Sequence, residues 1–199
     1  AIENKYGLKY FAGCKEDHLG SWFSGIENYP DGGVVRTFSR KKLEGIFDTC
    51  GVTERSFYYP YPDYKFMTTV YSDTYLPGRG ELSNNLRNFD RDRMLLFDEK
   101  SAFDGIVEEG LFSVFSNSYL AVIGKPFELK YVRYSNDRAE NFRIRTEILR
   151  DGQGHPAVRK YPLTEGAQEH VRHMAEAYEK LKERYAGSQL EVNVCHLGE

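Results

Sequence analysis

Apolar residues recur in part of the chain at the spacing of one helical face. Leu43, Ile46 and Phe47 have this spacing, which predicts a helix. Ser39 can cap the start of this helix, and Gly51 can end it in a left-handed conformation. The sequence therefore marks both ends of the helix as well as its buried face.

Two further helices are predicted, one over about residues 90–109 and one between Thr164 and Gly187. Gly110 is expected to end the first of them. The second helix has a stripe that we expect to be buried, made of Val171, Met174, Ala175, Tyr178, Leu181 and Tyr185.

Short apolar or alternating segments predict strands. They cover residues 53–62, 116–124, 128–134, 141–149, 156–163 and 190–197. Residues 1–34 and 60–88 are rich in Gly or Pro and are expected to be irregular, with one short helix in the first stretch. The pattern changes near residues 125–126, so we expect a mixed α/β (α+β) fold in two parts, residues 1–124 and 125–199.

Composition narrows the classes of function. The chain has 199 residues, of which 40% are hydrophobic and 29% are charged, and its formal net charge is −3. This charge gives no general attraction for nucleic acid, so no nucleic-acid partner is expected. The sequence has no run of 18 apolar residues and does not begin with a charged-then-apolar leader, so neither a membrane span nor a secretion signal is expected within it.

The cysteines are Cys14, Cys50 and Cys195. They are odd in number, lie far apart and form no C-x-x-C pair, which argues against a disulfide framework and against a structural zinc site. We expect three reduced thiols, no metal site and a cytoplasmic protein.

Several motifs in the first part resemble one enzyme family. AIEN at residues 1–4, VRTFSRKKLEGIFDTCGV at residues 35–52 and SNSYLAVIG at residues 116–124 resemble the C-terminal part of a class I S-adenosylmethionine-dependent methyltransferase domain. ENKYGLKYFAG, EDHLG and YYPYPDYK resemble, more narrowly, such domains in multidomain bacterial proteins of surface-polysaccharide assembly. In that fold a late strand is followed by a helix, a strand and a last antiparallel strand.

The resemblance implies a parent protein that transfers a methyl group from S-adenosylmethionine to a hydroxyl, with the rest of the parent chain as a partner. Glu3 and Asn4 would end the strand on the cofactor side. The Gly-rich turn that should hold the cofactor is missing, because no G-x-G-x-G occurs in the chain. We therefore expect this chain to be a truncated segment that binds no cofactor, in which Glu3 and Asn4 are structural.

The second part resembles the N-terminal lobe of a kinase-like fold, with hairpin strands followed by a long helix. Lys160, in the strand AVRK, would hold ATP phosphates, and Glu169 would be its ion-pair partner. No Gly-rich phosphate loop is present, since SNDRAENF stands in its place. The alternative is an exposed ion pair, which contributes only about 0–1 kcal/mol.

Two groups of residues in the first part could take part in chemistry. His18 could be a general base oriented by Asp17, or simply a loop histidine. A second group could form an acceptor pocket, with aromatic rings for a sugar and charged groups for its hydroxyls, or could cover the core from a strand. It consists of Tyr58, Tyr59, Tyr61, Asp63, Tyr64 and Lys65.

The sequence thus predicts a piece of a bacterial transferase of cell-surface glycan assembly that is inactive by itself. The alternative is a non-catalytic interaction or self-association module. The chain is rich in aromatic residues, with 15 Tyr and 13 Phe. Since such residues suit interfaces, we expect either a homodimer or a large contact between the two parts, built around residues 6–11 and 58–64.

Overall fold

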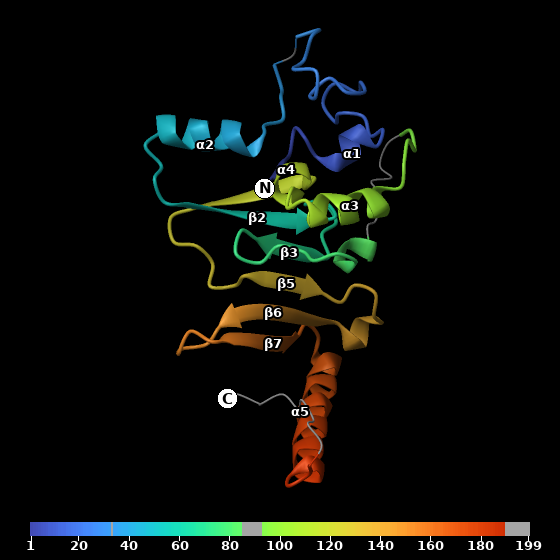
Figure 1. Cartoon of the computed structure of the whole chain (residues 1–199), viewed down its shortest axis with the longest axis vertical. Helices are drawn as coiled ribbons and strands as arrows, with labels where there is room; N and C mark the ends of the chain where they lie inside the picture. The colour runs from blue at the N-terminus through green and yellow to red at the C-terminus, as the bar shows by residue number, and fades with distance from the viewer. Residues whose placement is uncertain (33, 85–92, 190–199) are drawn as a thin grey trace.

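The computed structural model describes residues 1–32, 34–84 and 93–189. Within them, seven strands form one sheet in the order β1-β4-β2-β3-β5-β6-β7, and every neighbouring pair is antiparallel (Figure 1). The strands are β1 (Ile2–Glu3), β2 (Arg55–Tyr61), β3 (Thr69–Ser72), β4 (Ser118–Ile123), β5 (Tyr131–Tyr134), β6 (Ile144–Arg150) and β7 (Pro156–Pro162). With the helices that accompany it, this sheet confirms the mixed α/β class.

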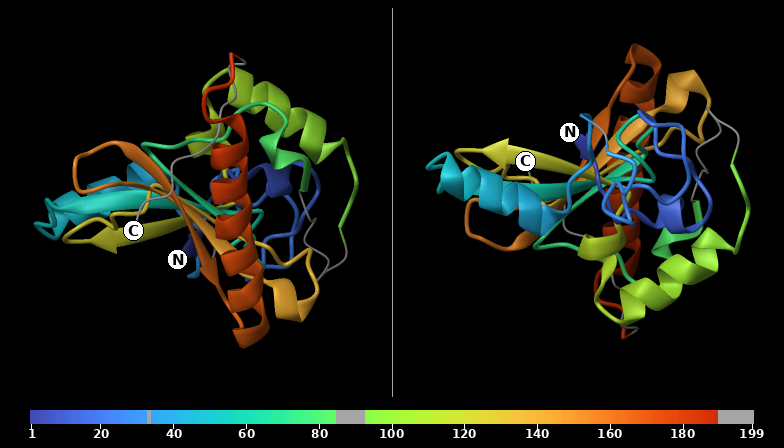
Figure 2. Two further views of the ribbon diagram at one scale, coloured as in Figure 1. Left: turned by 90° about the horizontal axis from the view of Figure 1, so that it is seen from below. Right: turned by 90° about the horizontal axis from the view of Figure 1, so that it is seen from above.

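The helices do not form one continuous layer over the sheet (Figures 1 and 2). They are α1 (Leu8–Phe11), α2 (Arg40–Thr49), α3 (Glu99–Glu108), α4 (Phe112–Phe115) and α5 (Glu165–Tyr185), with two 3₁₀ turns, η1 (Glu81–Asn84) and η2 (Glu140–Phe142). Figures 1 and 2 show α2 toward the start of β2, and α1 and α3 toward its end.

The local signals for the two best-marked helices are confirmed. The Ser39 side chain accepts a hydrogen bond from the backbone N–H of Lys42 at the start of α2, and Gly51 follows that helix with φ +72°. The Thr164 side chain accepts one from the N–H of Ala167 at the start of α5. The strands predicted at residues 53–62, 116–124, 128–134, 141–149 and 156–163 are also present, whereas the one predicted at residues 190–197 lies outside the described residues.

Two predictions of local structure need correction. The helix predicted over residues 90–109 is present as α3, but it begins at Glu99, with Asp98 as its cap; residues 90–92 lie outside the described residues. The segment before it is held against the α1 region, because the N–H of Met94 donates to the carbonyl of Gly13 at 3.0 Å. The stretch predicted to be irregular at residues 60–88 contains β3, whose backbone is paired by β2 and β5.

The two parts predicted from the sequence share this sheet. β3 of the first part pairs with β5 of the second, through Thr69 with Arg133 and Val70 with Val132. Tyr58 also contacts the second part, since its hydroxyl accepts a hydrogen bond from the N–H of Phe127 at 2.8 Å. A contact between the parts is therefore present, while their division into separate domains and the pairing of two copies stay predictions.

The core of the first part is mainly aromatic. Phe103 of α3 and Phe112 of α4 pack edge-on against Tyr61 and Tyr59 of β2, with ring centroids 5.7 Å apart in both pairs. Tyr119 of β4 joins them at 6.0 Å from Tyr59. The high tyrosine content therefore serves the interior to a large extent, and α3 and α4 cover this face of the sheet.

The second part is less deeply buried. The stripe predicted to be buried along α5 is half-buried at most of its positions, and Leu181 is 41% exposed. Ala167 is fully buried at the start of the helix, where α5 packs against β7 and η2. Among the helices of the described ranges, none combines the length and the apolar composition needed to cross a membrane.

Candidate functional site

A group of charged side chains is buried where α1 meets the ends of two strands. Lys9, on α1, is 1% exposed. Its Nζ lies 2.9 Å from Oε1 of Glu3, at the end of β1, and 2.7 Å from Oδ2 of Asp63, just after β2. Both carboxylates are themselves buried, so one ammonium group is shared by two acids away from water.

Three more side chains complete this charge cluster. The hydroxyl of Tyr10 donates to Oε2 of Glu3 at 2.8 Å. The ammonium of Lys65 lies 3.4 Å from Oε1 of Glu3 and pairs with Asp17. Lys65 is about a third exposed and connects the cluster to the surface. The charge cluster therefore consists of Glu3, Lys9, Tyr10, Asp17, Asp63 and Lys65.

Two asparagines hold the backbone around the cluster. The Asn4 amide donates to the carbonyls of Val114 and Ser116 at 2.6 and 2.7 Å. The Asn117 amide accepts from the N–H of Lys9 at 2.9 Å and donates to the carbonyl of Pro62 at 3.0 Å. These bonds join α1, the start of β4 and the end of β2, so the lysine and its acids are held in register.

The charges in the cluster stabilise one another. Burial lowers the pKa of Lys9, but the carboxylates of Asp63 and Glu3 outweigh burial and raise this pKa above its ordinary value. Burial, together with Glu3, raises the pKa of Tyr10, so its hydroxyl keeps its proton and remains a donor. The ammonium and the hydroxyl thus occupy acceptor positions on these carboxylates, and the cluster clamps α1 to the ends of β1 and β2.

A cavity of about 380 Å³ lies on the sheet where β3 and β5 pair. Tyr61 and Tyr71 line it and are buried, while Tyr75 and Tyr131 are half-buried. The ring centroid of Tyr131 lies 5.3 Å from that of Tyr71 and 5.1 Å from that of Tyr75. We call this cavity the tyrosine pocket.

Polar groups surround the rings of the tyrosine pocket. Glu81 of η1 and Arg133 of β5 both line it and are exposed. The hydroxyl of Tyr71 lies 3.5 Å from Oε2 of Glu81. Thr69 and Ser83 add further hydroxyls to the lining. A carboxylate and a guanidinium thus face one cavity together with aromatic rings.

Comparison with protein-family models, with curated proteins and with solved structures found no match for this chain. Any function must therefore be argued from the geometry and from the resemblance seen in the sequence. In the parts of the chain that the structure describes, no three or more His, Cys, Asp and Glu side chains are grouped to hold a metal ion.

The structure brings together residues that the sequence assigned to three different roles. Glu3, Asp17, Asp63 and Lys65 all belong to the charge cluster. Sequence reasoning missed Lys9, although it lies in the motif ENKYGLKYFAG. A lysine on the apolar side of a short helix was the available signal, but α1 has only four residues and is too short to show a period.

His18 lies in the loop after α1. Its side chain is exposed, and its backbone N–H donates to Oε2 of Glu16 at 3.0 Å. The Asp17 carboxylate pairs with Lys65. Burial raises the pKa of Asp17, but the ammonium groups of Lys65 and Lys9 and hydrogen bonding outweigh burial and lower this pKa. The role of His18 as a general base stays a prediction.

The predicted acceptor pocket does not form a single site. Its residues are divided between the aromatic core, the tyrosine pocket and the charge cluster, to which Asp63 and Lys65 belong. Tyr58 and Tyr59 are buried, and Tyr59 is bonded to Asp73 through its hydroxyl. Tyr61 donates to the carbonyl of Leu82 at 2.7 Å and lines the tyrosine pocket. Tyr64 is half-buried, with its N–H donating to Oγ of Ser118 at 3.2 Å.

Lys160 and Glu169 have separate surroundings. Glu169 lies 3.5 Å from Arg172 and 3.7 Å from His173 of its own helix. Lys160 is half-buried in β7 opposite Thr146 of β6. The ion pairs of Glu169 are thus within its own helix, and the role of Lys160 and Glu169 as a nucleotide clamp stays a prediction.

Proposed function

We propose that this chain binds a saccharide in the tyrosine pocket and that it is the acceptor-holding part of a bacterial transferase of cell-surface glycan assembly. The observation that carries the proposal is the half-buried ring pair of Tyr75 and Tyr131 beside Glu81 and Arg133. Aromatic faces pack against the C–H groups of a sugar ring, and charged groups bind its hydroxyls.

The dimensions of the pocket fit this class of ligand. Its volume of about 380 Å³ is within the range of small-molecule sites. Tyr61 and Tyr71 are fixed from below by the aromatic core, so the rings that face the ligand have a rigid support. A preorganised site loses less conformational entropy on binding than a flexible one.

The reaction class rests on the resemblance in the first part. The last strand of such a methyltransferase domain is antiparallel, and here β4 lies between β1 and β2 and is antiparallel to both. This arrangement supports the proposal that the parent transfers a methyl group from S-adenosylmethionine to a hydroxyl of a glycan. Since no G-x-G-x-G is present in these 199 residues, the cofactor would be held elsewhere in the parent. We expect the protein to act in the cytoplasm.

Calorimetry with the methyl glycosides of glucose, galactose, mannose and rhamnose tests saccharide binding. One ring contact contributes about 0.5–1.5 kcal/mol, so Tyr131→Ala should weaken binding by about 2- to 10-fold. Glu81→Gln, at an exposed position, should also weaken binding and leaves the fold intact. Tyr161→Ala is the matched control, because Tyr161 is half-exposed on β7 and lies outside the pocket. The proposal fails if no glycoside gives saturable binding, or if the control loses as much affinity as the pocket variants.

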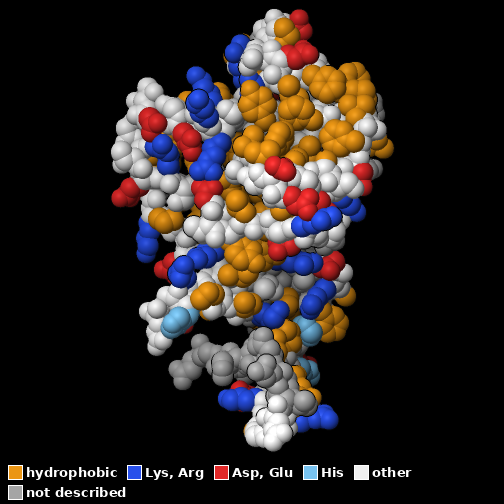
Figure 3. Space-filling model, in the orientation of Figure 1, with side chains coloured by type: hydrophobic (Ala, Val, Ile, Leu, Met, Phe, Trp, Pro, Cys, Tyr) orange, Lys and Arg blue, Asp and Glu red, His pale blue; other side chains and the backbone are white. Residues whose placement is uncertain are grey.

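A second candidate function, self-association, is favoured by exposed apolar side chains. Figure 3 shows hydrophobic side chains gathered over the region of α1, α3 and α4. Leu95 and Leu96 are 62% and 52% exposed just before α3, and Val114 of α4 is 45% exposed. The tyrosines at positions 58–61 are instead covered by the chain itself, so we place the proposed interface on the α3–α4 side.

Light scattering tests this second function. If the α3–α4 side is an interface, the chain should have the mass of a dimer, and Leu95→Ser with Leu96→Ser should give the mass of a monomer. Val158→Ser, at an exposed position on β7, should leave the dimer intact. If the chain is a monomer at all concentrations, self-association is ruled out. The proposal of saccharide binding does not depend on this result.

A further inference from the structure

A second cavity, of about 460 Å³, lies beside the start of α2. It shares no lining residue with the tyrosine pocket. Four basic residues line it, namely Lys5, Arg36, Lys41 and Lys42. None of its nine lining residues is Asp or Glu. In a chain with a net charge of −3, this cavity is a local concentration of positive charge, and we call it the basic cavity.

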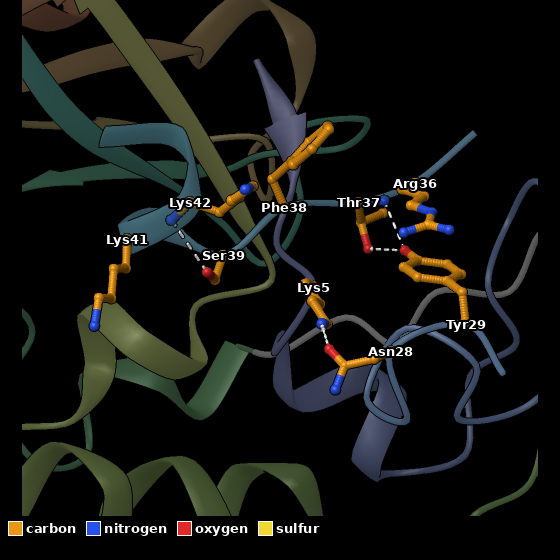
Figure 4. A pocket seen from close by; sticks show the side chains of 9 residues that line it. All are labelled: Lys5, Asn28, Tyr29, Arg36, Thr37, Phe38, Ser39, Lys41 and Lys42. Atoms are coloured by element: carbon orange, nitrogen blue, oxygen red, sulfur yellow. Dashed lines mark hydrogen bonds between the residues drawn. The ribbon is translucent and has the colours of Figure 1, made fainter. Parts of the chain in front are cut away.

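The frame of the basic cavity is built by Tyr29 (Figure 4). The Tyr29 hydroxyl accepts a hydrogen bond from the N–H of Thr37 at 2.7 Å and lies 2.7 Å from Oγ1 of the same residue. The ring of Tyr29 is buried, and the guanidinium carbon of Arg36 lies over it, 5.3 Å from the ring centroid. The segment that leads into α2 is thus fixed to the loop around Tyr29 before any ligand arrives.

The loop on the other side of the basic cavity is also tightly held. Asn28 and Tyr29 are consecutive non-glycine residues with φ of +63° and +58°, a conformation that costs free energy. The ammonium of Lys5 donates to Oδ1 of Asn28, and Figure 4 shows this lysine pointing across the cavity toward that loop. Lys5 and the stretch 36–42 therefore bring basic residues to the lining of one cavity, and the loop of Asn28 and Tyr29 helps to hold both in place.

The start of α2 has an unusual charge pattern. Helix N-termini favour acidic residues, yet the first turn of α2 contains no acid and begins Arg40-Lys41-Lys42. Arg40 is compensated by Glu44 at 2.9 Å and by Asp73 at 2.6 Å. In the described part of the chain, no carboxylate pairs with Lys41 or Lys42. A bound anion would offset the repulsion among these cations.

From these observations we infer that the basic cavity binds the phosphate or diphosphate group of a small phosphorylated ligand. Ammonium and guanidinium groups are the usual phosphate partners in proteins, and the hydroxyl of Ser39 at the helix start adds a polar contact. A phosphate alone would leave most of the 460 Å³ empty, so the ligand extends beyond it. The half-buried ring of Phe38 gives that extension an apolar surface. This site is separate from the saccharide site and does not depend on it.

Titration calorimetry and amide chemical shifts test this site with three probes, inorganic pyrophosphate, ADP and glucose 1-phosphate. We expect saturable binding of one equivalent by at least one probe, shifts centred on residues 36–42, and weaker binding at higher salt. Tighter binding of ADP or of glucose 1-phosphate than of pyrophosphate would identify the extension as a nucleoside or a sugar.

Matched charge variants make this test specific. Lys41→Gln with Lys42→Gln should weaken binding at least about tenfold, because each lost ammonium removes a charge-assisted contact. Lys180→Gln with Lys182→Gln removes the same charge from α5, and we expect less than a twofold change. Arg36→Gln, in an exposed loop position, is a second variant that should weaken binding without loss of fold. The inference is overturned if none of the probes saturates at millimolar concentration, or if the α5 variant loses as much affinity as the α2 variant.

Discussion

Replacement of Lys9 by methionine should destabilise the chain strongly. The substitution keeps a side chain of similar length but removes the ammonium that lies 2.9 Å from Glu3 and 2.7 Å from Asp63. Breaking a buried ion pair costs about 3–5 kcal/mol, since the remaining charge stays buried without its partner. Here two carboxylates lose their shared cation and repel each other. We therefore expect the free energy of unfolding to fall by an amount near the upper end of that range. Such a loss is a large fraction of the ~5–15 kcal/mol typical of folded chains.

The loss should depend on pH. At about pH 7 the Lys9→Met variant would have to bury both Glu3 and Asp63 as anions, whereas at about pH 5 one of them can take up a proton. The native state then binds more protons than the unfolded state, so the stability of the variant should rise as the pH falls. Its deficit relative to the original chain should therefore shrink between these two values.

Urea unfolding followed by circular dichroism measures both effects. Lys180→Met is the matched control, because Lys180 is exposed on α5 and lies outside the charge cluster, so its loss should cost less than about 1 kcal/mol. Adding Glu3→Gln and Asp63→Asn to Lys9→Met should recover most of the lost stability. A cost below about 1 kcal/mol for Lys9→Met, or a deficit that is the same at both pH values, would refute the clamp role of the charge cluster.

Three further predictions concern alkaline pH, the thiols and the cofactor. Burial raises the pKa of Tyr59, Tyr61 and Tyr71 above their ordinary value of about 10, so the stability they contribute is present below that pH and is lost as the pH rises above it. Phenolate absorbance should show them ionising only as the chain unfolds, and ionisation within the folded chain would contradict their burial. A thiol reagent should modify the exposed Cys50 in the native chain and the buried Cys14 only after unfolding, with three thiols in total in denaturant. Calorimetry should detect no S-adenosylmethionine binding by this chain, and micromolar affinity would contradict the argument from the missing Gly-rich turn.

Local signals in the sequence were sufficient for several elements. Ser39 and Thr164 mark helix starts because a side-chain cap is a contact between neighbours in the chain. β6 and β7 could be predicted because their alternation is regular and their connecting turn is short. In each case the deciding interaction lies within a few residues of the pattern that predicts it.

Long-range contacts decide the elements and site residues that were missed. β3 has only four residues between Gly- and Pro-containing stretches, and its strand conformation depends on β2 and β5 at its sides. Lys9 is 54 residues from Asp63, and nothing near either of them in the sequence indicates that they meet. The basic cavity likewise needs Lys5 to approach residues more than thirty positions away.

The narrow pairing between β3 and β5 has a consequence for how the chain opens. This junction has two paired positions, Thr69–Arg133 and Val70–Val132, whereas β6 and β7 pair at seven. Hydrogen exchange should therefore find two cooperative units, with the segment from β5 to α5 opening at a lower free energy than the aromatic core. The tyrosine pocket spans the junction, taking Tyr71 from one side and Tyr131 from the other. A ligand held by both rings would join the two units, and amide protons in β6 would then exchange more slowly although no part of the ligand is bonded to them.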